Sequence, residues 1–119
     1  MGKRSRRRGA DTLKAPESEY RSPSGDVLAL RGAMTPATRH EYAAAMAGSP
    51  LSQEDAWQRG VEFLFERLAT RWEIAGTDPI TKQKELLARY RFATQDERRW
   101  IRDALREHLT AHFPDVEAP

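Results

Sequence analysis

Residues 51–76, LSQEDAWQRGVEFLFERLATRWEIAG, decide the fold of this chain. Ser52 is a good N-cap, and Asp55, three positions later, can bind free N–H groups of the first helical turn. When the stretch is wound as a helix at about 100° per residue, its large apolar side chains fall on one stripe, and a smaller second group of apolar residues lies about 100° away. Gly76 offers the left-handed residue that ends a helix, and Pro79 prevents continuation. The stretch therefore predicts one long central helix with neighbours on two sides.

The flanking sequence predicts three further helices from similar start and stop signals. These signals are an N-cap residue, a proline at the first helical position and, in the last helix, a Thr-x-x-Glu capping box. The expected bounds are Thr35 to Gly48, Thr77 or Asp78 to Arg91, and Thr94 to Pro114. A turn at 23–26 precedes the apolar run Val27 to Leu30, for which we expect an extended segment, because a lone strand would have no partner.

The predicted fold is all-α, a compact bundle of about four helices. A disordered basic N-terminal leader precedes it, because the first residues contain too few apolar side chains to offset the entropy of ordering. The expected parts are a disordered Arg-rich leader (1–24), an extended segment (25–34), a helical domain (35–114) and a flexible tail (115–119).

Composition excludes several classes of protein. No apolar run approaches the roughly 20 residues that a membrane span requires, so we expect no membrane association. The sequence has no cysteine, which excludes disulfides, thiolate nucleophiles and cysteine metal sites and agrees with a reducing compartment. No apolar h-region follows the basic start, so we expect a cytoplasmic protein.

Most of the positive charge is concentrated at the start of the chain. The net charge is +2, and five cations lie within the first eight residues, which leaves the other residues at −3. Such a run is typical of a solvated tail, or of a segment that contacts nucleic-acid phosphates or an acidic surface without reading sequence. The candidate contact residues are Lys3, Arg4, Arg6, Arg7 and Arg8.

The last predicted helix carries two weaker patterns. With the helix before it, it could form a helix-turn-helix that offers four arginines to DNA, but four acids on the same helix cancel their charge. We therefore expect an ordinary solvated face. His108 and His112 have the spacing of two metal ligands on one helix, yet HLTAH lacks the glutamate of HExxH and no third ligand is evident. A structural role is predicted, and a pH-sensitive contact stays open.

No pattern in the sequence specifies a reaction. Nucleophile elbows, glycine-rich phosphate loops and paired ExxH motifs are absent, so we expect no enzyme, no cofactor and no metal. Trp100 lies about 100° from the apolar stripe of its helix, where it either covers a neighbouring helix or is exposed. An exposed tryptophan is typical of a partner contact, and Trp100 is our candidate.

Most of the chain after the leader resembles a group of small actinobacterial proteins, including streptomycete ones, to which no activity is assigned. The resemblance is carried by ALRGAMTPATRHEYA (29–43), EDAWQRGVEFLFERLA (54–69) and KELLARYRFATQDERRWIRDALREHLTAHFP (84–114). It implies a bacterial cytoplasmic setting and carries over no functional residue. The leading hypothesis is a non-enzymatic protein-interaction or regulatory module that binds an unknown protein partner or itself. The alternative is a nucleic-acid-associated protein that binds phosphates through the leader.

Overall fold

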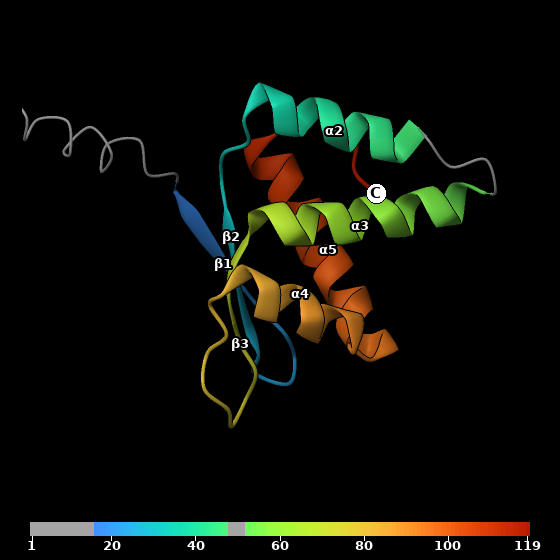
Figure 1. Ribbon diagram of the computed structural model, residues 1–119. Helices are drawn as coiled ribbons and strands as arrows, with labels where there is room; N and C mark the ends of the chain where they lie inside the picture. The colour runs from blue at the N-terminus through green and yellow to red at the C-terminus, as the bar shows by residue number, and fades with distance from the viewer. Residues whose placement is uncertain (1–15, 48–51) are drawn as a thin grey trace, which may run out of the picture.

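The computed structural model describes residues 16–47 and 52–119. Four helices and a three-stranded antiparallel sheet make up this part of the chain, so the fold is mixed α/β and the all-α prediction is wrong. The strand order is β1-β2-β3 (Figure 1). In chain order the elements are β1 (Glu17–Arg21), β2 (Val27–Arg31), α2 (Pro36–Ala47), α3 (Gln53–Leu68), β3 (Ala69–Glu73), α4 (Gln83–Arg91) and α5 (Gln95–His112).

The predicted central helix divides into helix α3 and strand β3. Ser52 caps α3 by accepting from the main-chain N–H of Asp55, as expected. The helix ends at Leu68, because Ala69 has extended backbone angles. Trp72 lies on this strand and is fully buried. It was therefore correctly expected to be a core residue, but its backbone is extended rather than helical. Gly76 has a φ of +85°, but in a turn after β3 rather than at a helix end.

Strand β2 is the centre of the sheet, and its neighbours explain why the expected lone extended segment is a true strand. β3 pairs with it on one side through Leu28 opposite Trp72, and β1 pairs on the other through Tyr20 opposite Leu28. β1 lies within the residues that we expected to be a disordered leader. A buried apolar strand needs partners for its N–H and C=O groups on both edges, and two polar segments supply them.

The remaining helices follow the predictions with one shift. Helix α5 has the predicted capping box of Thr94 and Glu97. Helix α2 begins at Pro36, and its expected end at Gly48 lies outside the described residues. Helix α4 begins only at Gln83, because Ile80 pairs with β3 opposite Trp72 instead of starting the helix.

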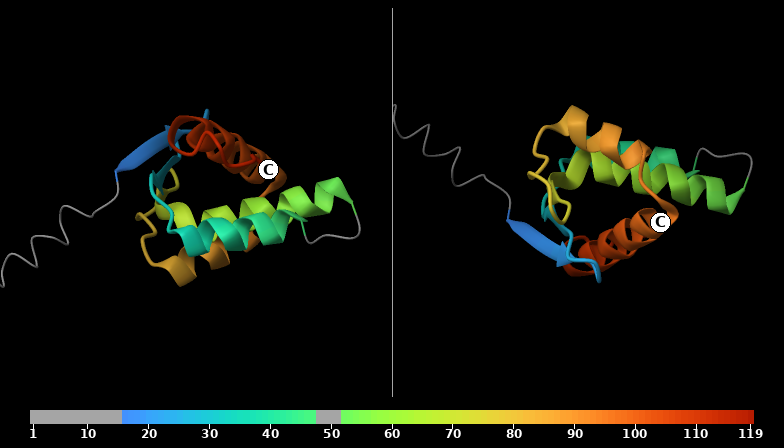
Figure 2. Two further views of the ribbon diagram at one scale, coloured as in Figure 1. Left: turned by 90° about the horizontal axis from the view of Figure 1, so that it is seen from above. Right: turned by 90° about the horizontal axis from the view of Figure 1, so that it is seen from below.

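The core lies where the sheet meets the helices (Figures 1 and 2). Helices α2 and α3 run side by side, and Gly60 makes this approach close: a Cβ there would lie 2.6 Å from the Met46 sulfur. The predicted inner residues of α5 are buried. The largest fully buried side chains are Trp72, Tyr42, Phe65, Phe113, Leu28, Leu30, Leu64, Leu68, Ile101, Leu105, Leu109 and His108.

The segment after α5, where we expected a flexible tail from residue 115, packs against the helices. Tyr42 donates its phenol hydrogen to the main-chain oxygen of Glu117 at 2.6 Å. Pro119 is buried, and its main-chain oxygen accepts from Arg102 at 3.2 Å and from Arg106 at 2.6 Å. The segment therefore connects α2 to α5.

Candidate interaction surface

His108 joins helix α5 to two strands of the sheet. Its Nε2 lies 2.8 Å from the main-chain oxygen of Arg31, and its Nδ1 lies 2.8 Å from the hydroxyl of Tyr20. A carbonyl oxygen can only accept, so Nε2 carries the hydrogen and Nδ1 accepts from the tyrosine. Burial lowers the pKa of His108, the bond to Arg31 opposes this shift, and the charge of His112 adds to it. The ring is therefore a neutral structural group, fully hydrogen-bonded.

His112 completes the contact between α5 and the sheet. Its Nε2 lies 3.0 Å from the hydroxyl of Ser18 on β1, and its ring centroid lies 4.5 Å from that of His108. Across residues 16–47 and 52–119, no three histidine or acidic side chains are grouped so that they could hold a metal ion. The pair that resembled a metal site thus fastens a strand to a helix.

The arginines of the helix-turn-helix hypothesis have local partners. Arg99 pairs with Asp96 at 3.1 Å. Arg98 donates to the main-chain oxygens of Arg91 and Ala93, and the other two bind Pro119. Guanidinium groups that already hold main-chain oxygens are poorly placed to contact DNA phosphates, so these contacts favour the structural interpretation.

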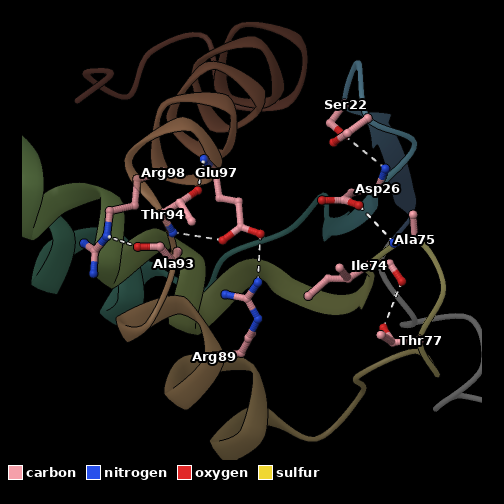
Figure 3. A network of polar contacts seen from close by, with 11 residues as sticks. Ser22, Asp26, Ile74, Ala75, Thr77, Arg89, Ala93, Thr94, Glu97 and Arg98 are labelled. Atoms are coloured by element: carbon pink, nitrogen blue, oxygen red, sulfur yellow. Dashed lines mark hydrogen bonds and ion pairs between the residues drawn. The ribbon is translucent and has the colours of Figure 1, made fainter.

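The joint between α4 and α5, residues 92–94, is fixed by three sets of contacts (Figure 3). Glu97 closes the capping box with the main-chain N–H of Thr94 and accepts from Arg89 at 2.7 Å. Burial alone would raise the pKa of Glu97, but these bonds outweigh it and lower the pKa, so the carboxylate stays ionised. Arg98 binds the joint from α5 through the main-chain oxygen of Ala93.

Phe92 lies in this joint with 85% of its surface exposed. It is the only large hydrophobic side chain that the described part of the chain leaves exposed. The backbone N–H of Phe92 donates to the main-chain oxygen of Arg89, which holds the main chain from which the ring projects. Sequence reasoning did not select Phe92, although a helix continued by one residue would place it about 200° from the buried Tyr90.

Trp100, our predicted contact residue, is partly buried. It lines a cleft of about 440 Å³ between the β1–β2 turn and the first turns of α5. Trp100 and Phe92 are thus presented differently, because Trp100 lines a cleft and Phe92 projects directly to the exterior. The five basic residues predicted to contact phosphates or acidic surfaces lie outside the described residues.

None of the helices in the described ranges combines the length and apolarity needed to cross a membrane. Comparison of the chain with protein-family models, with curated proteins and with solved structures gives no match, so the resemblance to actinobacterial proteins stays a prediction.

Proposed function

We propose that the folded part is a protein-interaction module whose contact surface is centred on Phe92. A cytoplasmic setting is part of this proposal, in agreement with a sequence that lacks cysteine. The observation that carries it is the 85% exposure of a phenylalanine on a joint fixed from both neighbouring helices. Phenylalanine gains about 1.5 to 3 kcal/mol on full burial, so a partner with a matching apolar pocket would bind here.

The rigidity of the joint favours binding through this residue. A contact residue that must first be ordered loses part of its binding free energy, at about 0.5 to 1.5 kcal/mol per side chain. The Thr94–Glu97 capping box and the Arg89–Glu97 ion pair fix the backbone around Phe92 before any partner arrives. The side chain of Arg91, the preceding residue, is held by Glu62 at 2.8 Å.

The proposal is tested by comparing Phe92→Ser with a matched control, Lys84→Ser, at an exposed position of the preceding helix α4. The full chain is used to capture proteins from a lysate of its source organism, and the captured protein is then purified. Calorimetry with the purified partner should show Phe92→Ser weakening binding at least about tenfold, which corresponds to 1.4 kcal/mol. Lys84→Ser should bind like the unaltered chain.

Self-association is measured in parallel by sedimentation of the same three proteins. If the partner is a second copy, the dimer should dissociate in Phe92→Ser and persist in Lys84→Ser. Both variants should keep the circular dichroism and melting temperature of the unaltered chain, because neither side chain is buried. Binding of the partner with equal affinity by Phe92→Ser would contradict the proposal.

A further inference from the structure

The cleft beside Trp100 is a second candidate site, and it shares Glu97 with the contacts that fix the Phe92 joint. One wall comes from the β1–β2 turn and the other from the first turns of α5. Its volume of about 440 Å³ is large enough to admit a long side chain. The lining residues are Ser22, Pro23, Ser24, Asp26, Asp96, Glu97, Arg99, Trp100 and Asp103.

Asp26 places a carboxylate at the buried side of this cleft. Only 5% of the residue is exposed. One of its carboxylate oxygens accepts from the main-chain N–H of Ala75 at 3.0 Å, and the other points away from Ala75 (Figure 3). Within the described residues no donor binds this second oxygen. A nearly buried carboxylate with an open oxygen is available to a cationic ligand.

The other charged groups of the cleft leave it negative. Its lining contains four carboxylates and a single guanidinium. Asp96 is paired with Arg99 and Glu97 with Arg89, whereas Asp103 forms no ion pair within the described ranges. Two carboxylates, those of Asp26 and Asp103, therefore have no cationic partner among the residues that the structure describes.

The chemistry of the cleft fits a guanidinium or ammonium group. Trp100 offers an indole ring, the aromatic side chain that binds cations best, and the carboxylates of Asp26 and Asp103 can accept charge-assisted hydrogen bonds. An extended basic segment would satisfy both kinds of contact.

We propose that this cleft binds the arginine-rich N-terminal segment of the same chain, Lys3 to Arg8. The segment carries five positive charges and the rest of the chain has a net charge of −3, so the two are complementary. In this arrangement the cations that could contact nucleic-acid phosphates are occupied by the protein's own carboxylates.

The chain is long enough for this contact. β1 ends at Arg21, next to the turn that lines the cleft, so the distance that a segment starting before Glu17 has to cover is about the length of β1, roughly 17 Å. The eight Cα–Cα steps from Arg8 to Pro16 can span about 27 Å when extended. Arg8 and the residues before it can therefore reach the cleft without any change in the sheet.

The test uses a nitroxide spin label on the full chain. The sequence has no cysteine, so Ser5→Cys gives a unique attachment site between Arg4 and Arg6. Nuclear magnetic resonance then follows the indole N–H signals of the three tryptophans, Trp57, Trp72 and Trp100. The expected result is loss of the Trp100 signal through paramagnetic broadening, with smaller effects on the other two, and recovery of the signal at high salt.

Substitutions of the cleft carboxylates make the test specific. Asp103→Asn alters an exposed side chain, and Asp26→Asn keeps an oxygen that can accept from Ala75, so both variants should fold. Each should restore the Trp100 signal, whereas Asp115→Asn, an exposed carboxylate outside the cleft, should not.

Three outcomes would overturn the proposal. The first is a Trp100 signal that is broadened no more than that of Trp57. The second is broadening that persists in both Asp26→Asn and Asp103→Asn, because the contact would then not depend on the cleft. The third is equal broadening when the label is carried only by a second, isotopically invisible copy, which would assign the contact to another molecule.

Discussion

At the scale of single residues, the hydrogen bonds of His108 predict how stability depends on pH. The folded state holds the ring neutral with a lowered pKa, whereas the unfolded chain binds a proton near the ordinary pKa of about 6.5. As the pH falls through 6.5, the unfolded state takes up the proton first, so the free energy of unfolding decreases. It continues to decrease until the lowered pKa of the folded state is reached.

The measurement is urea unfolding at about pH 7.5 and about pH 5.5, where His108 should account for a loss of about 1 kcal/mol. His108→Gln keeps an N–H that can donate to Arg31 and removes the titration, so its stability should change less between the two pH values. His40→Gln, at an exposed position of α2, should retain the full dependence. An identical pH response in His108→Gln would exclude this origin.

For His108 and His112 the sequence predicted a structural role at the end of their own helix, whereas their side chains bond to β1 and β2, which are distant in the sequence. The surface residue was harder to find, because exposure depends on what the neighbouring elements cover. Trp100 is partly buried and lines a cleft together with the β1–β2 turn, and a turn that comes near α5 only in the folded chain leaves no local signal in the sequence.

At the scale of elements, local capping signals were reliable and long-range pairing was not. The capping box of α5 and the cap of α3 involve residues three apart, so their chemistry is contained in the sequence. Strand β3 is stabilised by Val27–Leu30, some forty positions earlier. Residues 69–73 fit the apolar period of α3 because Trp72 lies four residues after Leu68, so periodicity alone could not show that the helix had ended.

The capping box also predicts a measurable effect on α5. Thr94→Ala removes the acceptor for the main-chain N–H of Glu97 and should lower the free energy of unfolding by about 1 kcal/mol. Thr110→Ala provides the control, because this exposed threonine of the same helix bonds only to the main-chain oxygen of Arg106. Equal stabilities of the two variants in urea titrations would show that the cap contributes little.

At the scale of the whole molecule, the Phe92 joint and the Trp100 cleft are held in place by different contacts. The joint that carries Phe92 is fixed by hydrogen bonds from α4 and α5. The exposure of the Phe92 side chain therefore follows from how these two helices are connected. The Trp100 cleft lies instead between the β1–β2 turn and α5, elements brought together by the contacts of His108 and His112. Loss of those histidine contacts should therefore affect the cleft more than the joint.

The segment after α5 gives the last prediction, because it joins helices that are distant in the sequence. Removal of residues 115–119 exposes the buried surface around Gly60 and takes away the acceptor of the Tyr42 hydroxyl. Loss of the partly buried Val116 and the buried Pro119 should lower the free energy of unfolding by about 2 kcal/mol.

A control separates this packing from the charges of the segment. Asp115→Ala with Glu117→Ala removes two exposed side chains but keeps the main-chain oxygen that Tyr42 binds, so its stability should stay within about 0.5 kcal/mol of the unaltered chain. Urea unfolding of the three proteins measures the difference. If the shortened chain unfolds at the same urea concentration as the full one, the segment is a passive tail, and the close approach of α2 and α3 at Gly60 does not depend on Pro119.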